Sequence, residues 1–355
     1  MTRLIISAHE ALLCAACDGE AGISDLYAAR RDAPDDVGAV VSAKVVQTLP
    51  GQGAAIVRWA QAGADREGYW NDAAAKNAKA GDVLRLQIKA AAQGAKLPQL
   101  KRDIALPGRF LIHLPAGKGI KFSRQQEGAS EAPPLQDLRG GWVVRRAAAG
   151  VAAALLRQEA EALAALGVQD AQQEEIAAPT VWQRALVESG ENLRTILVAD
   201  AALERAVGAW LNVFAPDLLG GLTVQPDALD WDSLFAEATA PTLSLNGGGS
   251  ITVERTRAAW VADIDAGAAQ YHLAVNLAAV TVLARQMRLR NLTGILLADF
   301  ISLPNVRDQQ QLLKALRAAV ATDPAGVEVF GLTKLGLVEM TRTRRGQSLD
   351  EITRF

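Results

Sequence analysis

Two apolar segments that end in aspartate, separated by a helical pattern, constrain the fold of this chain most strongly. The first is WVADIDAG at 260–267, with Asp263 and Asp265, and the second is TGILLADF at 293–300, with Asp299. A short apolar run of this kind is typical of a buried strand. The order strand, helix, strand predicts a right-handed crossover that places the two strands parallel in one sheet.

These aspartates are predicted to lie at the carboxyl edge of the sheet, where open α/β sheets place their ligands. If the strands are neighbours, they lie about 4.8 Å apart, so Asp263 and Asp299 emerge together. Asp265 is two residues from Asp263 and can share its face of the strand. Two or three converging carboxylates repel one another, and a hard divalent cation relieves that repulsion. Oxygen ligands suit magnesium or manganese, so we predict a metal held by Asp263 and Asp299.

Each aspartate also has competing explanations. Asp favours the N-cap of a helix, and for one Asp alone this explanation would usually win. Two acids on a crossover pair favour metal ligation instead. A further hypothesis makes Asp263 the nucleophile and Asp265 the acid of an Asp-x-Asp phosphotransferase or phosphatase. Such enzymes usually have Thr or Val where this chain has Gly267, and they need a separate lysine motif, so the pattern disfavours this hypothesis.

A longer match surrounds the two motifs. Residues 251–345 contain, in order, ERTRAAWVADIDAG, NLAAVTVLARQMRLRNLTGILLADFISL and GLTKLGLVEMTRTRR. This region resembles the catalytic end of the ribonuclease E/G family. Members show Asp-hydrophobic-Asn, then Asn-Leu-Glu-Ala-Ala leading to Arg-Gln-Leu-Arg-Leu-Arg, then Asp-Phe-Ile-Asp and Gly-Leu-(Leu/Val)-Glu-Met-(Thr/Ser)-Arg. The order and the spacing agree, and a fainter resemblance runs to the amino terminus.

The resemblance implies an α/β chain (α+β, with several subdomains). An RNase H-like subdomain would combine 1–35 with 183–240, and an OB-type RNA-binding barrel would occupy 36–98. A 5′-sensor-like subdomain would follow at 99–182, and a DNase I-like βαβ catalytic subdomain at 241–355. The residue pattern agrees for the barrel, because short β segments between turn residues fill that part of the chain.

Hydrophobic spacing gives expectations for further elements. It predicts an amphipathic helix over 147–166, ended by Gly167, and a hairpin around three glycines over 243–255. Helix 271–290 has apolar residues spaced by four and three positions, which is typical of one face packed on a sheet. A helix near 305–320 and the strand VEVFGL after it would complete a βαβαβ layer.

The family resemblance implies a magnesium-dependent endoribonuclease that cuts single-stranded RNA in rRNA maturation or mRNA decay. Bound magnesium would lower the pKa of a coordinated water, whose attack on phosphorus leaves 5′-phosphate and 3′-hydroxyl ends. Asp263 and Asp299 match the metal ligands. Asp265 stands where the family usually has Asn, and either residue can orient the water. Ser302 replaces a further Asp of the family motif.

The barrel retains only some of the family's RNA contacts. Lys96 matches a lysine that approaches the RNA backbone, and Tyr69 stands where the family has a base-stacking Phe. Ile56 replaces a second aromatic residue, and Ala90 and Gln93 replace basic ones. Because stacking contributes roughly 1–3 kcal/mol per base, this barrel is expected to hold RNA more weakly or less selectively.

Arg145 and Arg146, in GGWVVRRAAAG, match an Arg-Thr pair that binds the 5′-monophosphate of the substrate in this family. An arginine fork suits phosphate oxygens, but Arg146 replaces the threonine. The alternative is an exposed pair of arginines at the end of a strand. Both explanations stay open, and 5′-end sensing with them.

The overall charge argues against a strongly basic nucleic-acid-binding protein, since the net charge is −2 and the pI about 6.0. The reduced barrel contacts and the low pI together motivate an alternative function, a non-catalytic RNA-binding relative of the same family. Arginines are nevertheless clustered, and a local cluster matters more to a phosphate than the global sum. The competing interpretation is a solvated helix end and a flexible tail, formed by Arg285, Arg288 and Arg290 and by Arg342, Arg344 and Arg345.

Cysteine usage and hydropathy indicate a cytoplasmic protein. No secretory signal is expected at the start, and no apolar stretch approaches the about 20 residues of a membrane span. Two cysteines fit a reducing compartment, and Cys14 and Cys17 are expected to be buried, independent thiols. The family's zinc-binding Cys-Pro-x-Cys does not occur before Phe355. Neither a zinc-linked dimer nor the long scaffold of larger members is therefore expected, while a homodimer through the catalytic subdomain stays open.

Overall fold

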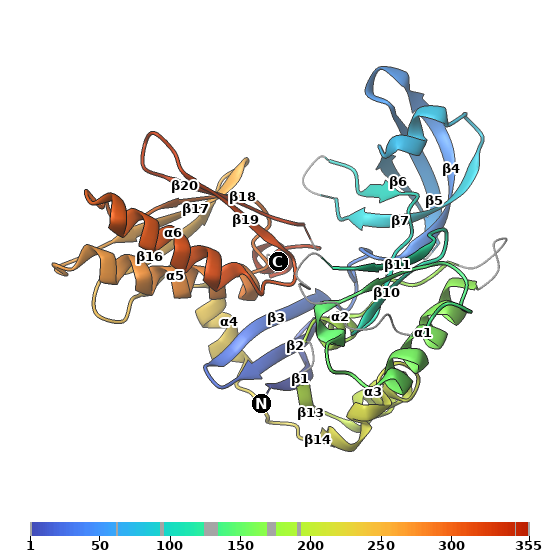
Figure 1. Cartoon of the computed structure of the whole chain (residues 1–355), viewed down its shortest axis with the longest axis horizontal. Helices are drawn as coiled ribbons and strands as arrows, with labels where there is room; N and C mark the ends of the chain where they lie inside the picture. Colours follow the sequence, from blue (N-terminus) through green and yellow to red (C-terminus); the bar gives the residue numbers. More distant parts are fainter. Residues whose placement is uncertain are drawn as a thin grey trace. The chain divides into compact units, whose positions relative to one another are not determined.

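The computed structural model describes residues 2–61, 63–92, 96–123, 134–168, 175–189, 193–344 and 346–353. By its internal contacts the chain divides into two units. The first comprises Met1–Glu20 and Ala29–Ala228, and the second comprises Ala21–Ala28 and Leu229–Phe355. Figure 1 colours the chain from its blue N-terminus to its red C-terminus. Helices, several sheets and a closed barrel together confirm the predicted α/β class.

One sheet joins strands that are far apart in the sequence. Its order is β14-β13-β1-β2-β3, with β1 parallel to β13 and antiparallel to β2. Its strands are β1 (Thr2–His9), β2 (Leu12–Gly19), β3 (Gly22–Arg30), β13 (Leu193–Val198) and β14 (Leu222–Val224); the nearby helices are α2 (Val181–Glu188), α3 (Ala201–Phe214) and η5 (Pro216–Gly221). Cys14 and Cys17 are buried thiols in β2 and are not joined in a disulfide, as predicted. Burial raises the pKa of the Cys14 thiol to about 12.

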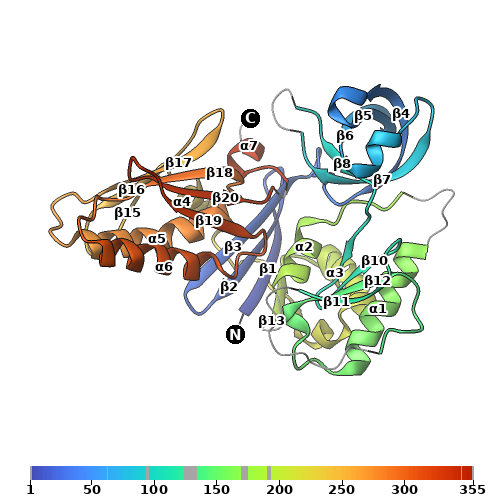
Figure 2. The same cartoon turned by 45° about the horizontal axis from the view of Figure 1, so that its top comes forward.

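A five-stranded barrel in the first unit closes in the order β4-β5-β6-β8-β7 (Figure 2). Its elements are β4 (Val40–Leu49), η1 (Pro50–Gln52), β5 (Ala54–Gln61), β6 (Ala64–Trp70), η2 (Ala73–Asn77), β7 (Val83–Ala90) and β8 (Gln99–Lys101). Alternate strand residues fill the interior, and Val57, Leu86 and Ile88 are at most 2% exposed. Trp59 and Trp70 lie in the same core at 3% and 0% exposure. Neither indole therefore offers a face on which a base could stack.

The remaining part of the first unit is a four-stranded sheet packed against one long helix. The sheet order is β11-β12-β10-β9, and the elements are β9 (Leu106–Pro107), β10 (Leu111–Leu114), β11 (Gly119–Phe122), β12 (Gly141–Val144), η3 (Arg146–Ala148) and α1 (Ala153–Val168). The helix predicted over 147–166 is wrong at both ends. Helix α1 begins later, because Gly150 has a left-handed φ of +74°, and it includes Gly167. A side chain at Gly167 would clash, since a Cβ there would lie 2.8 Å from the His113 ring.

The second unit contains a six-stranded sheet in the order β15-β16-β17-β18-β20-β19. Its elements are α4 (Trp231–Thr239), β15 (Thr242–Ser244), β16 (Ser250–Arg255), β17 (Ala259–Asp265), α5 (His272–Leu289), β18 (Gly294–Asp299), α6 (Val306–Val320), β19 (Val327–Leu332), β20 (Val338–Arg342) and α7 (Leu349–Ile352). The glycine hairpin is confirmed, since β15 and β16 pair antiparallel. The βαβαβ prediction is incomplete, because β20 lies between β18 and β19 and is antiparallel to both.

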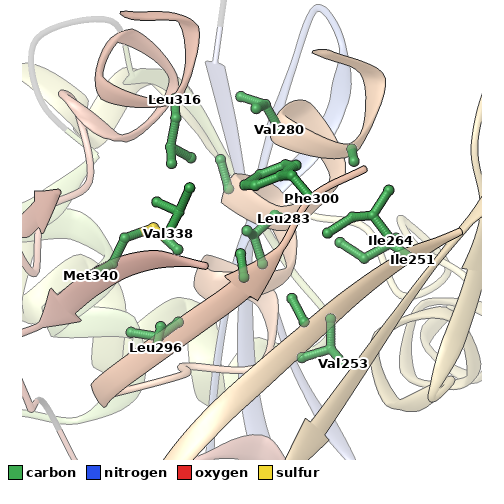
Figure 3. Packing of buried hydrophobic residues seen from close by; sticks show 14 of the residues in the cluster. Ile251, Val253, Ile264, Val280, Leu283, Leu296, Phe300, Leu316, Val338 and Met340 are labelled. Carbon is green, nitrogen blue, oxygen red and sulfur yellow. The ribbon is translucent and has the colours of Figure 1, made fainter. Parts of the chain in front are cut away.

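Helices α5 and α6 lie side by side along this sheet (Figure 1). Figure 3 shows Val280, Leu283 and Leu316 gathered with Leu296 and Met340 of the strands. The predicted packing of one face of α5 on the sheet is thereby confirmed. Because these strand side chains point to the helices, the alternate strand residues project from the other face of the sheet. Within the described ranges, no helix is long and apolar enough to cross a membrane.

Candidate active site

Asp263 of β17 and Asp299 of β18 are direct partners in the parallel register of their strands. The predicted crossover is therefore confirmed, with α5 as its helix. Neighbouring strands lie about 4.8 Å apart, so the two carboxylates start from adjacent backbone positions. Both residues are exposed.

The sheet places these aspartates on its face away from α5 and α6. Trp260, Ala262 and Ile264 of β17 are buried in the core, and the alternating aspartates point the other way. The N-cap explanation for the acids is wrong. Helix α5 has Tyr271 at its N-cap, and α6 has Asn305, whose side chain accepts a hydrogen bond from a backbone N–H of the first turn.

Asp265 lies on the same strand face, but its side chain is hydrogen-bonded to the backbone. Its Oδ1 accepts a hydrogen bond from the N–H of Gly267 at 2.7 Å, which shapes the turn after β17. Gly249, with φ +84°, approaches this turn closely, since a Cβ there would lie 2.4 Å from the carbonyl oxygen of Asp265. The last glycine of the hairpin is therefore required by packing beside the acids.

Asn276 of α5 fixes the chain just beyond Asp299. Its side chain is fully buried. Nδ2 donates to the carbonyl oxygen of Ile301 at 2.8 Å, and Oδ1 accepts from the N–H of Ile301 at 3.0 Å. Sequence reasoning assigned Asn276 no role. The signal that could have found it is an amide in the middle of the buried stripe of an amphipathic helix, where a polar group needs a partner.

The carboxylates offer the oxygen ligands that magnesium and manganese prefer. Within the described residues, no hydrogen bond or ion pair engages the side chains of Asp263 and Asp299. Across the same residues, no group of three or more His, Cys, Asp or Glu side chains is placed to hold a metal ion. Of the two or three carboxylates predicted to converge, Asp263 and Asp299 lie in direct register, and Asp265 does not join them in a group of three. The donor pair fits a cation that keeps several waters of its own, as magnesium usually does.

The barrel brings the two expected RNA contacts to one neighbourhood. Tyr69 is half-buried in β6 and faces Ile56 across the β5–β6 pair. Its hydroxyl donates to Oε1 of Gln52 at 3.0 Å. Lys96 is exposed and lies two residues before Pro98, whose carbonyl oxygen accepts from the Tyr69 N–H at 2.8 Å. Gln93 lies outside the described residues.

Arg145 is half-buried and ties two backbone segments together. Its Nη1 donates to the carbonyl oxygens of Gly108 at 2.5 Å and Val187 at 2.8 Å. Arg146 begins η3 and is exposed. The description of an exposed arginine pair is therefore wrong for Arg145 and correct for Arg146. At least one nitrogen of the Arg145 guanidinium is committed to the fold.

The clustered arginines form ion pairs inside the second unit. Arg285 pairs with Glu237, and Arg288 donates to Asp25 at 2.6 Å. Arg290 pairs with Asp350 at 3.0 Å and Arg342 with Asp323 at 2.8 Å. The interpretation as a solvated helix end and flexible tail is wrong for these four. Arg344 is exposed, and Arg345 lies outside the described residues.

A buried carboxylate that sequence reasoning missed holds the turn between β9 and β10. Glu159 of α1 is 2% exposed. It accepts hydrogen bonds from the backbone N–H groups of Arg109, Phe110 and Leu111 at 2.5, 2.9 and 2.9 Å. Burial raises its pKa from 4.5 to about 7, and this effect outweighs the three N–H donors, which favour the carboxylate.

Glu159 should make the first unit less stable at higher pH. Because its folded-state pKa lies above the ordinary value of 4.5, its contribution is complete below that pH and is lost as pH rises through about 7. The loss should amount to about 3 kcal/mol. Urea unfolding followed by tryptophan fluorescence between about pH 5 and 8 measures this slope. Glu159→Gln should flatten it, whereas Glu161→Gln, an exposed neighbour, should not; equal slopes would contradict the assignment.

Comparison with known proteins decides the family. A model described as the Ribonuclease E/G family matches residues 105–345. The chain belongs to this family. The matched range includes Arg145 and both aspartates of the acid pair, so the ribonuclease E/G resemblance seen in the motifs is confirmed.

Several ribonucleases are similar to this family member over most of its length. Ribonuclease E of Nostoc sp. (strain PCC 7120) is 31% identical over 308 residues, which cover 75% of this chain and 44% of that protein. Ribonuclease G of Escherichia coli K12 is 29% identical over 303 residues, 77% of this chain and 62% of that protein. Ribonuclease G of Haemophilus influenzae is 29% identical over 301 residues, 77% and 61% respectively. The chain thus spans about half the length of these relatives.

Proposed function

We propose that this ribonuclease E/G family member is a metal-dependent endoribonuclease that cuts single-stranded RNA. The observation that carries the proposal is the register of Asp263 with Asp299, two exposed carboxylates on the adjacent ends of parallel strands. Magnesium is the expected metal, and manganese is an alternative. The RNA would come from rRNA precursors or mRNA, and the reaction would take place in the cytoplasm.

Each residue near the acid pair would have a distinct role in the reaction. Asp263 and Asp299 would hold the metal, which lowers the pKa of a bound water and polarises the scissile phosphate when present. Asp265 would orient the attacking water, and Asn276 would keep Asp299 in place through Ile301. In-line attack on phosphorus would break its bond to the 3′-oxygen, leaving 5′-phosphate and 3′-hydroxyl ends.

The remaining assignments are based on the same family resemblance. The barrel would hold the strand, with Tyr69 against a base and Lys96 against the backbone. Arg145 and Arg146 would meet a 5′-monophosphate. The subdomain boundaries would be 1–35 with 183–240, 36–98, 99–182 and 241–355, and a homodimer would form through the last of these.

A cleavage assay tests the proposal directly. The substrate is a fluorescently labelled, 5′-monophosphorylated, AU-rich single-stranded oligonucleotide, with magnesium, with manganese or with EDTA. We expect cutting with either metal and none with EDTA. The downstream fragments should be digested by an exonuclease that requires a 5′-phosphate. A folded protein that binds the RNA but never cuts it would favour the alternative, a non-catalytic RNA-binding relative. The thinned barrel contacts at Ile56 and Ala90 are the reason to retain that alternative.

A further inference from the structure

Two peptide groups at the turn between β9 and β10 join Glu159 to Arg145. The Gly108–Arg109 group donates its N–H to Oε1 of Glu159 at 2.5 Å, and its carbonyl oxygen accepts from Nη1 of Arg145 at 2.5 Å. The Phe110–Leu111 group donates its N–H to Oε2 of Glu159 at 2.9 Å, and its carbonyl oxygen accepts from the backbone N–H of Arg145 at 2.8 Å. The turn therefore bridges a carboxylate on α1 and an arginine directly after β12.

Each of these peptide groups lies in the middle of a chain of hydrogen bonds, which runs from the carboxylate through an N–H and a C=O to an N–H of Arg145. Neighbouring hydrogen bonds in such a chain polarise and strengthen one another. Because the charge of a carboxylate strengthens the bonds that it accepts, Glu159 makes the carbonyl oxygens of Gly108 and Phe110 better acceptors for Arg145. The position of the arginine thus depends on a side chain of α1.

The backbone between the two side chains is tightly constrained. A Cβ at Gly108 would lie 2.6 Å from Cδ of Glu159, so the carboxylate packs directly against the glycine. The N–H of Gly108 donates to the carbonyl oxygen of Leu111 at 2.7 Å, which closes the turn. Nη1 of Arg145 also donates to the carbonyl oxygen of Val187 at 2.8 Å. A displacement of the carboxylate would therefore move the turn, and with it one of the carbonyl groups that hold the guanidinium.

Glu159 is a carboxylate without an ion pair of its own within the described ranges. Arg109, whose N–H it accepts, pairs with Asp217 at 2.7 Å instead. Burial of a carboxylate without a paired cation is unfavourable, and a neutral side chain of the same size would pack α1 against the turn without that cost. Buried ionisable groups in such environments gather at functional sites. The carboxylate therefore points to a role beyond packing.

We propose that Glu159 is a positioning residue, which sets the Arg145 guanidinium for a phosphate and so determines how strongly the protein prefers RNA with a 5′-monophosphate. The inference rests on the proposed function, which assigns Arg145 to that phosphate. A planar guanidinium binds phosphate oxygens in a restricted set of orientations, so its affinity depends on how firmly Gly108 and Val187 hold Nη1. Glu159 acts on the first of these contacts through the Gly108–Arg109 peptide group.

Cleavage by the full chain of one labelled oligonucleotide, prepared with a 5′-monophosphate and with a 5′-hydroxyl, tests the proposal. The quantity compared is the ratio of kcat/KM for the two substrates. Glu159→Gln keeps the size of the side chain but removes its charge and one acceptor oxygen. The ratio should fall by about tenfold or more, the effect of weakening a charge-assisted contact, mainly through a higher KM for the monophosphorylated substrate. The control Glu161→Gln, at an exposed position of the same helix, should leave the ratio unchanged.

The same ratio separates positioning from a purely structural role, because a smaller folded fraction lowers both rates alike. An unchanged ratio in a folded variant would therefore overturn the proposal. Circular dichroism melting shows which variants fold. If the glutamine variant does not, Glu159→Asp takes its place, since it shortens the side chain and should also lower the ratio.

A double variant tests whether Glu159 acts through Arg145. If it does, adding Glu159→Gln to Arg145→Lys should lower the ratio no further, whereas an additive loss would overturn the proposal. A wild type that cuts both substrates equally well would also overturn it, while leaving the nuclease intact. A wild type that cuts neither substrate would overturn the proposed function, and the inference with it.

Discussion

Alanine at Asp263 and Asp299 is expected to abolish metal-dependent RNA cleavage while leaving RNA binding and stability nearly unchanged. Each single variant should lower kcat by about a hundredfold or more, the scale on which one group that stabilises transition-state charge acts. Both side chains are exposed, so their removal should cost little folding free energy. Initial cleavage rates over a magnesium titration, together with urea unfolding, measure both effects.

The matched control for this prediction is Asp265→Asn. This change introduces the residue usual in the family, on the same strand face as Asp263. An asparagine Oδ1 can still accept the Gly267 N–H that Asp265 accepts at 2.7 Å, so the turn after β17 should persist. Activity should therefore be largely retained. If the Asp263 and Asp299 variants cut RNA as fast as this control, the acid pair does not hold the metal.

Arg342→Met is expected to destabilise the second unit by about 3–5 kcal/mol, the cost of breaking a buried ion pair from one side. The side chains of Arg342 and Asp323 are 5% and 2% exposed. Arg342 also donates to Oδ1 of Asn291 at 2.9 Å and to the carbonyl oxygen of Leu292 at 3.1 Å. Its removal leaves a buried carboxylate and two acceptors without this donor. Urea unfolding at neutral pH measures the loss.

Two further variants distinguish the buried pair from a general effect of lost charge. Arg344→Met removes an exposed arginine two residues away and should change the free energy of unfolding by less than about 0.5 kcal/mol. The double variant Arg342→Met, Asp323→Leu should recover part of the loss, because it removes the unpaired carboxylate as well. A double variant as unstable as the sum of its single variants would show that the pair does not act as a unit.

Local pattern predicted the elements around the site well. The two apolar runs that lead to Asp263 and Asp299 form strands β17 and β18, which pair in parallel register. The amphipathic stretch over 271–290 forms helix α5 between them. The two strands are short apolar runs, the helix repeats apolar residues at spacings of four and three, and the crossover rule leaves one arrangement for them. The bounds of helix α1 were predicted less accurately. Its start depends on the left-handed conformation of Gly150, and its last turn depends on the close approach of Gly167 to His113.

Contacts between distant residues were not predictable from local pattern. The basic motif around Arg285 and Arg290 suggests a surface that could meet phosphate. Its partners Glu237 and Asp350 lie far away in the sequence, and only the packed unit brings them within reach. Asn276 is similar, because its role depends on the backbone of Ile301, which lies 25 residues later in the sequence and just beyond β18.

The sequence by itself determined the family and the α/β class, through motifs that resemble those of the family. It also determined the crossover that sets Asp263 beside Asp299, because that arrangement depends on local periodicity and on the handedness of the chain. Only the tertiary structure decided that β20 separates β18 from β19, that Asp265 turns to the N–H of Gly267, and that the arginines are paired. These features require groups that are far apart in sequence to satisfy each other's hydrogen bonds and charges. These hydrogen bonds and ion pairs depend on the packing of the whole chain and produce no periodic pattern in the sequence.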